Sequence, residues 1–287
     1  MAKASKKELL AAVRNSLKAL RYSARSSVMG SDANDLYEVF LLLKVVEAGR
    51  AAGYGVHLAY DSPQPSTKNS KIPPPTELCV RRSPAHLYSA KDSLGRYYTH
   101  LVLTNAHAPA LGVYVGVRVM GRSGVLSEAD VLVMDEGVAR SRVSAKEDPK
   151  AVEGDVRIHI EGKNYSDRVN LAAVRSFVGM AADFYTTQTV PRHPSKSLMA
   201  ATQVGKAAEE FGNDTPSVPT IVFSGTFPGN EAALVNHLKD LLSPCPIGLV
   251  HPGAYCAPAG LRGRTAKETP MTCALAADGR LRWKRLT

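Results

Sequence analysis

The chain has 287 residues, of which 44% are apolar, so it is long enough to bury a substantial core in one large domain or one domain with appendages. Its 36 Lys and Arg exceed its 26 Asp and Glu, and the net charge of +10 favours a polyanionic partner. No apolar run approaches the roughly 20 residues of a membrane-spanning helix, so no membrane partner is expected. The cysteines are not spaced as a zinc site, and without a secretory signal we expect reduced thiols in a cytoplasmic protein.

The N-terminal part of the chain is predicted to be helical. Residues 6–22 carry leucines at helical spacing between basic residues, which is typical of a basic amphipathic helix. A second helix is expected to begin after Ser31 and Asp32 and to end near Gly53 or Gly55, because short polar residues cap helix starts and glycine ends helices. Residues 62–75 are rich in Pro, Ser and Lys and are predicted to form an exposed loop.

The middle of the chain is predicted to form strands. They are expected at residues 98–103, 112–120, 129–134 and 155–163, which are rich in Val, Ile and Leu. Valine occupies every other position of the second segment, and the glycines within residues 121–124 indicate a turn after it.

The remainder alternates between helical and extended patterns. Helices are predicted at residues 167–184, 197–211 and 231–242, and strands at 220–224 and 247–250. Helices, then an antiparallel meander, then this alternation predict an α/β fold with a mixed central β-sheet flanked by helices.

The chain is divided by charge and composition into three parts. We expect a basic N-terminal helix over residues 1–30, a core over residues 31–255 and a basic C-terminal extension over residues 256–287. The extension is predicted to end in a hairpin that turns at Asp278-Gly279.

Three charged residues stand at the ends of apolar strands. Asp130 opens one predicted strand, and Glu161 and Lys163 end another. Side chains two residues apart on a strand point to the same face, so Glu161 and Lys163 are expected to be neighbours. If the two strands pair, Asp130 lies beside them and completes an anionic pocket. Gly162 is expected to leave room there for a substrate backbone.

Such a pocket suits phosphodiester hydrolysis. Carboxylate oxygens are the ligands that hard divalent cations such as Mg²⁺ prefer, and the bound cation generates hydroxide near neutral pH. An ammonium group beside the carboxylates can orient the attacking water or stabilise charge that develops in the transition state.

The set Asp130, Glu161-Gly162-Lys163 resembles the D…E-x-K signature of the PD-(D/E)xK, or restriction-endonuclease-like, nuclease superfamily, with Ala129 at the position of its proline. Residues 121–130 also resemble a G-x-S-G-x-x-x-E-x-D stretch found in some members. In this family an early helix often donates a further acid, which Glu38 matches. The layout of residues 32–250 is similar to the family's order of helix, three-stranded meander, helix and strand.

The resemblance implies a restriction-endonuclease-like core and a Mg²⁺-dependent endonuclease acting on DNA, with Mn²⁺ as a substitute, in a prokaryotic defence or restriction system. Asp130 and Glu161 would bind metal, Glu38 would bind a second metal or hold a metal-bound water, and Lys163 would orient water or stabilise the transition state. Cleavage of both DNA strands would call for two active sites, so a homodimer is expected.

Several assignments leave alternatives open. Glu38 is either a site residue or the partner of Lys44 or Arg50 on a helix surface. Glu128 shares a strand face with Asp130 and is either an outer ligand or the partner of Arg122.

Arg122, Arg168, Arg175 and Asn164 are the candidate nucleic-acid contacts. Arg168 and Arg175 are expected to share one helix face, which could equally be a solvated face, and Asn164 could equally cap a loop. His159 is expected to be packed or exposed rather than part of the site.

The basic cluster near the C-terminus is either a DNA-binding tail, with Trp283 among its charges, or a solubilising tail. Its members are Arg262, Arg264, Lys267, Arg280, Arg282, Lys284 and Arg285.

Two other functions remain open. The fold could serve as a nucleic-acid-binding or scaffolding subunit whose nuclease activity is silent or depends on a protein partner such as a helicase, ATPase or sensor, or it could cleave RNA as a toxin does. The sequence contains no GxSxG, HExxH or P-loop motif, which excludes the corresponding catalytic templates.

Overall fold

The fold is taken from a computed structural model of the chain. It describes residues 4–25, 28, 31–61, 73–81, 84, 86–87, 95, 97–106, 108–144, 151–184, 196–214, 220–227, 229–242, 251–255, 262–264, 269–276 and 278–285. The predicted strand at residues 247–250 lies outside these residues, as do residues 62–72 of the predicted loop.

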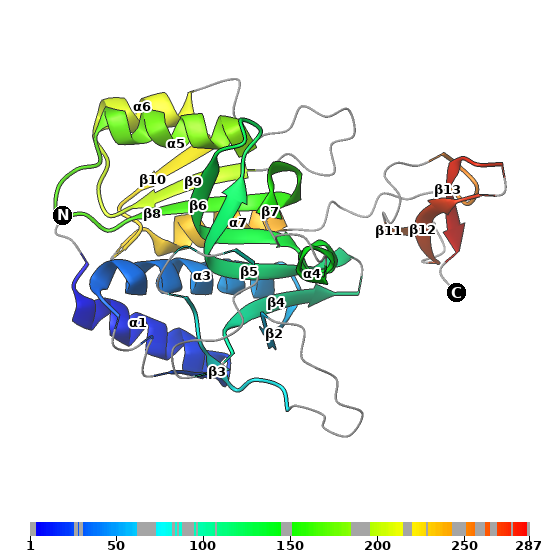
Figure 1. Ribbon diagram of the computed structural model, residues 1–287, viewed down its shortest axis with the longest axis horizontal. Helices are drawn as coiled ribbons and strands as arrows, with labels where there is room; N and C mark the ends of the chain where they lie inside the picture. The colour runs from blue at the N-terminus through cyan, green and yellow to red at the C-terminus, as the bar shows by residue number, and fades with distance from the viewer. Residues whose placement is uncertain are drawn as a thin grey trace.

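An eight-stranded mixed sheet is the centre of the described structure (Figure 1). Its order is β10-β9-β8-β6-β5-β4-β2, and β7 pairs with β5 beside this path. The strands are β2 (Gly55–Tyr60), β4 (Thr99–Asn105), β5 (Ala108–Met120), β6 (Leu126–Asp135), β7 (Ala151–Val152), β8 (Val156–Lys163), β9 (Lys196–Ala201) and β10 (Thr220–Ser224). Strands β8, β9 and β10 are parallel, whereas β2, β4, β5, β6 and β8 form the antiparallel meander. The predicted α/β fold with a mixed sheet is therefore confirmed.

Helices cover both faces of the sheet. One face carries α1 (Lys6–Ala19), α3 (Ala33–Ala51) and α7 (Glu231–Leu242), whose buried side chains share a core with Val131, Ile158 and Leu198. The other face carries α4 (Glu136–Ser144), α5 (Leu171–Phe184) and α6 (Lys206–Asn213), which pack over Leu132 and Met199. Burial of apolar area on both faces is the main source of stability for such a three-layer arrangement.

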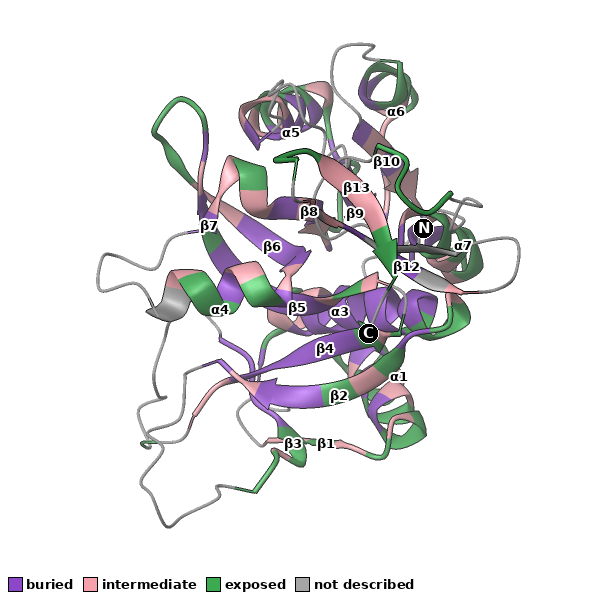
Figure 2. Cartoon of the chain, turned by 90° about the vertical axis from the view of Figure 1, so that its right-hand side faces the viewer, coloured by how far each residue is buried: buried purple, intermediate pink, exposed green. Residues whose placement is uncertain are grey.

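Helix α3 is the central helix of the fold. It packs between the sheet, α1 and α7, which explains why nearly every residue from Leu36 to Val46 is buried. Figure 2 shows α3 and the middle strands β4, β5 and β6 in the colour of buried residues. The helix begins where predicted, because the Asp32 carboxylate accepts hydrogen bonds from the backbone N–H groups of Asn34 and Asp35.

One expectation about secondary structure is wrong, and some elements were not expected. The helix predicted at residues 197–211 is the strand β9 followed by the shorter helix α6. Strand β9 is buried on both faces, so its apolar run lacks the alternation that marks a half-exposed strand. Strand β2 and helix α4 were not predicted at all.

A second, smaller sheet lies near the C-terminus. Strands β11 (Arg262–Arg264), β12 (Pro270–Leu275) and β13 (Leu281–Arg285) pair antiparallel, and the turn at Asp278-Gly279 is confirmed. Gly279 has a positive φ of 73°, which a residue with a side chain rarely adopts. Elsewhere, the two-residue strands β1 (Ser23–Ala24) and β3 (Glu77–Leu78) pair in parallel. The segment η1 (Glu153–Asp155) is one 3₁₀ turn.

The cysteines differ from expectation. Cys273 is disulfide-bonded, which corrects the prediction that all four thiols are reduced, whereas Cys79 is free and buried. Among the described helices, none has the length and apolarity to cross a bilayer.

Candidate active site

The candidate site lies where strands β6 and β8 separate. The two strands pair from Met134 and Val156 as far as Val131 and Ile160, and beyond that point β8 continues along β9. Past the last backbone pair of β6 and β8, the Asp130 side chain links the two strands, because its Oδ2 accepts a hydrogen bond of 2.7 Å from the backbone N–H of Gly162. This bond satisfies a backbone donor and fixes the acid at the fork between the strands.

Glu161 and Lys163 meet Asp130 at this fork. The Lys163 ammonium donates a short hydrogen bond to Glu161 Oε1, and its Nζ lies 3.9 Å from Asp130 Oδ2. The expectation that Glu161 and Lys163 are neighbours is thus confirmed, as is the pairing of their strand with that of Asp130. The three side chains are 12–19% exposed, so they are mostly shielded from water but reach the surface.

Gly162 faces α3 rather than a substrate. A Cβ at this position would lie 2.8 Å from Cδ1 of Leu41 and 3.4 Å from Cδ1 of Tyr37. The absence of a side chain lets α3 close against β8. This corrects the expectation that Gly162 leaves room for a substrate backbone.

Glu38 of α3 belongs to the same electrostatic environment. Burial raises its pKa to about 9, and the negative charges of Asp130 and Glu128 add to the shift. The alternative partner Lys44 is bound elsewhere, since its Nζ lies 2.9 Å from Glu47 and 2.8 Å from Glu231. Glu38 therefore faces the anionic cluster and is protonated at neutral pH.

Burial and a neighbouring carboxylate raise the pKa values of Asp130 and Glu128 but not that of Glu161. Burial and the neighbouring charge of Glu161 raise the pKa of Asp130 to about 7, although Lys163 opposes the shift. The pKa of Glu128 is raised by burial and by Glu161. The pKa of Glu161 is lowered although burial opposes this, because His159 and Lys163 stabilise its charged form. The cluster thus carries more carboxylates than Lys163 alone can neutralise.

His159 supports Glu161 from the interior. It is fully buried between β8 and α5, where its ring contacts those of Phe177 and Phe184. Its Nε2 lies 3.8 Å from Glu161 Oε2, and its Nδ1 lies 3.3 Å from the Ser197 hydroxyl. His159 is therefore packed, as expected, but it also contacts a site residue.

The donor chemistry of the cluster fits a hard divalent cation. Asp130 and Glu161 offer carboxylate oxygens, and their uncompensated negative charge is what a cation would neutralise. Among the described residues, however, no three His, Cys, Asp or Glu side chains are gathered as a ready-made metal site. The Lys163 ammonium lies where it neutralises part of the charge.

The turn that carries Arg122 is docked on α5. Asp183 accepts hydrogen bonds from the backbone N–H and the hydroxyl of Ser123, at 2.8 and 2.7 Å, and a Cβ on Gly121 would collide with that carboxylate. Arg122 itself is exposed. Glu128 faces Arg118 across the β5–β6 ladder, and the charge of Arg118, not that of Arg122, acts on its pKa.

The other candidate nucleic-acid contacts are dispersed. Arg168 is exposed in the loop before α5, and Arg175 lies on α5 with its guanidinium 5.7 Å from the Phe211 ring, so the two do not share a helix face as expected. Asn164 is buried, and its amide donates to the carbonyl of Ala33 at 3.1 Å, which makes it a link between β8 and the start of α3. Its side chain is thus held in the interior rather than on the exposed surface.

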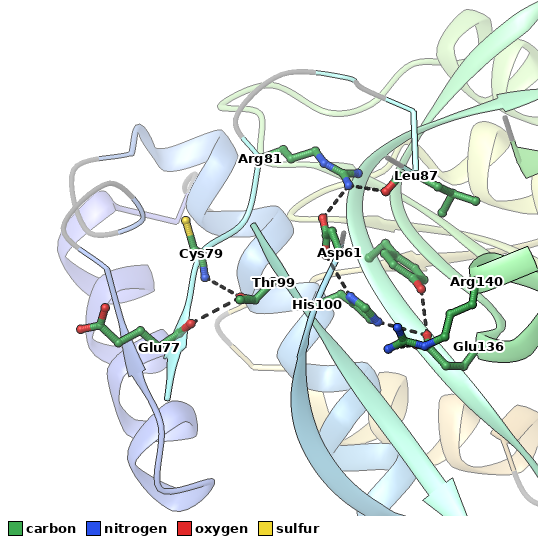
Figure 3. A network of polar contacts seen from close by, with 10 residues as sticks. Asp61, Glu77, Cys79, Arg81, Leu87, Thr99, His100, Glu136 and Arg140 are labelled. Atoms are coloured by element: carbon green, nitrogen blue, oxygen red, sulfur yellow. Dashed lines mark hydrogen bonds and ion pairs between the residues drawn. The ribbon is translucent and has the colours of Figure 1, made fainter. Parts of the chain in front are cut away.

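A second buried polar network, which the sequence did not indicate, lies farther along the sheet (Figure 3). His100 on β4 contacts Asp61 through Nδ1 at 2.9 Å and Glu136 through Nε2 at 3.0 Å. Arg81 donates to Asp61, and the Tyr114 hydroxyl donates to Glu136 at 2.9 Å. Burial opposes the charging of His100, but the two carboxylates raise its pKa. The network joins the end of β2, β4, β5 and α4.

This network is separate from the candidate site. Tyr114, which stacks on His100, pairs with Leu132, and Leu132 pairs with His159. Three strand spacings of about 4.8 Å therefore put His100 roughly 14 Å from His159.

Comparison with known proteins assigns no family. The sequence matches no protein-family model and no curated protein. Among solved structures, the fold is similar to the apo form of NucC from E. coli MS115-1, with 11% sequence identity and a TM-score of 0.26 over 61% of this chain and 68% of that chain.

Proposed function

We propose that this protein is a metal-dependent endonuclease of the PD-(D/E)xK type that hydrolyses phosphodiester bonds in DNA. The observation that supports this most is the meeting of the Asp130 carboxylate with the Glu161–Lys163 pair at the fork between β6 and β8. Holding three charged groups in a mostly buried place costs desolvation free energy, which is typical of reaction centres.

Asp130 and Glu161 are the residues that would hold Mg²⁺, with Mn²⁺ as a substitute. When bound, the cation would lower the pKa of water and neutralise charge on the phosphate. Gly162 and His159 orient the two carboxylates, through the backbone N–H on Asp130 and the imidazole beside Glu161. Fixed carboxylates lose little entropy when they bind a ligand.

Lys163 and Glu38 have the remaining roles in the proposed mechanism. The burial of Lys163 disfavours its charge, but Glu161 and Asp130 raise its pKa, so it is a permanent cation that can orient water and stabilise the developing charge on phosphorus. Glu38 is protonated at neutral pH, because its pKa is about 9, and it can hold a water molecule by hydrogen bonding or donate a proton.

A binding or scaffolding subunit with silent or partner-dependent activity is the second candidate function. It is favoured by the direct contact between Lys163 and Glu161 and by the lack of a gathered three-donor metal site in the described residues. A partner such as a helicase, ATPase or sensor would then have to rearrange the cluster before a cation binds.

Cleavage of matched oligonucleotides tests the substrate class. Fluorescently labelled duplex DNA, single-stranded DNA and RNA of one sequence are incubated with the protein in Mg²⁺, Mn²⁺ or EDTA. Cuts in DNA that require a divalent cation are expected. Cleavage of RNA alone would replace the DNA endonuclease with a ribonuclease, and intact substrates under all conditions would favour the binding subunit.

A further inference from the structure

Positive charge is concentrated at the C-terminal end of the chain. Residues 251–287 contain seven Lys or Arg and two Asp or Glu, so they hold half of the net charge of +10. Affinity for a polyanion grows with the number of cations that replace its counterions. The electrostatic affinity of this protein for a polyanion is therefore concentrated outside the central sheet.

The small sheet presents these charges on one side. Figure 1 shows β11, β12 and β13 set apart from the central sheet. Met271 and Cys273 on β12 are buried, and Cys273 pairs with Trp283 of β13. Because side chains alternate along a strand, Arg282 and Lys284 lie on the opposite face from Trp283. The face of Met271, Cys273 and Trp283 is thus mainly apolar, with Arg285 at its end, and the opposite face is basic.

Tyr255 lies on the basic face. It pairs with Arg282 at the free edge of β13, and the residue is 59% exposed. The guanidinium of Arg282 lies 4.3 Å from the ring centroid and that of Arg280 lies 5.5 Å from it. The Tyr255 hydroxyl accepts hydrogen bonds from both arginines, and Asp278 binds Arg282 at 2.8 Å. An aromatic ring is therefore held in place, exposed and surrounded by cations.

We propose that Tyr255, Arg280, Arg282 and Lys284, the Tyr255 face, bind nucleic acid. The cations would contact phosphates, and the tyrosine ring would stack on a base, which favours single-stranded or locally unpaired DNA. A tail that only confers solubility has no need to order two arginines around an exposed ring. The inference rests on the proposed function in that the face would hold the DNA that the Asp130 site cuts.

Fluorescence anisotropy tests the proposal on the full chain. Labelled single-stranded and duplex DNA are titrated in EDTA, which prevents cleavage, over a series of salt concentrations. Each phosphate contact contributes about 0.9 to the slope of log affinity against log salt on duplex DNA and about 0.7 on single-stranded DNA. The double variant Arg280→Glu, Lys284→Glu is therefore expected to lower the slope by about 1.8 on duplex and about 1.4 on single-stranded DNA, and to weaken binding in 0.1 M salt by on the order of 50-fold and 25-fold.

A matched control alters the net charge by the same amount at other positions. Lys7→Glu with Lys206→Glu alters two exposed lysines on α1 and α6 and is expected to change affinity less than about 3-fold. Thermal unfolding shows whether each variant is folded. If the reversal variant is not, Arg280→Gln with Lys284→Gln removes the same charges more mildly and is expected to lower the slope as well.

The aromatic ring is tested separately. Tyr255→Ala is expected to weaken single-stranded binding by about 10-fold, whereas Tyr255→Phe keeps the ring and most of the affinity. The proposal would be overturned if the double variant Arg280→Glu, Lys284→Glu and the matched control bound DNA with equal affinity. It would also be overturned if poly-glutamate displaced DNA at equal charge concentration. Because binding is measured without cleavage, a failure of the nuclease proposal would not alter this result.

Discussion

The contact between Gly162 and α3 leads to a sharp prediction. In Gly162→Ala the new methyl group would lie 2.8 Å from Cδ1 of Leu41, a fully buried side chain, and 3.6 Å from Oδ2 of Asp130. Overpacking of this kind costs about 1–3 kcal/mol, because neighbours must leave their preferred rotamers or the helix must move. We expect the free energy of unfolding to fall by that amount and DNA cleavage to fall with it, since α3 also carries Glu38.

Gly179 on α5 provides the matched control. A Cβ there meets no atom within 4 Å, and alanine is a better helix former than glycine by about 0.5–1 kcal/mol, so Gly179→Ala should stabilise the protein. Urea unfolding followed by circular dichroism measures both variants. A Gly162→Ala protein at least as stable as wild type would refute the reasoning that α3 closes on β8 through this glycine.

Three further predictions concern charge. His100→Gln removes the imidazole between the buried carboxylates of Asp61 and Glu136, which keep their ion pairs with Arg81 and Arg140. The change should cost about 1–3 kcal/mol in urea unfolding, whereas exposed His57→Gln should change little. Because the folded pKa of His100 is raised, its contribution to the free energy of unfolding is complete below about pH 6.5 and is lost as pH rises through the folded pKa. The loss of stability in His100→Gln, measured by urea unfolding, should therefore shrink at alkaline pH. Asp130 and Glu38 have raised folded pKa values of about 7 and 9, so without metal the protein should lose stability as pH rises from about 4 to 9. The Asp130→Asn variant should lose less stability over this range. A melting temperature that does not depend on pH would contradict this expectation. Added Mg²⁺ should raise the melting temperature at pH 8, and this rise should vanish in EDTA and in Glu161→Gln; an equal rise in that variant would place the cation elsewhere.

Local signals in the sequence account for much of the fold. The N-cap Asp32 and the apolar pattern after it located α3, and alternating valines located β5, because these features act over a few residues. Strand β9 was mistaken for a helix because it is buried on both faces, where periodicity no longer separates the two structures.

The candidate site was predictable where its residues lie close together in the sequence. The positions of Glu161 and Lys163 on one strand brought them together, and the expected pairing of that strand with the strand of Asp130 added the third residue. The burial of Asn164 could not be predicted, because its partner Ala33 is 131 residues away. The His100 network was missed for the same reason, since pairing of distant strands assembles it.

The most direct measurement is cleavage of supercoiled plasmid in Mg²⁺ by wild type, Glu161→Gln and Lys163→Met. The surface pair Lys206 and Glu210, whose charges lie 3.8 Å apart on α6, provides the matched controls Lys206→Met and Glu210→Gln. We expect wild type to nick or linearise the plasmid and EDTA to abolish this cleavage. The cleavage rate should fall by about 100-fold or more in both site variants and remain unchanged in both controls. Equal cleavage by wild type and the site variants would contradict the assignment of the reaction centre to Asp130, Glu161 and Lys163.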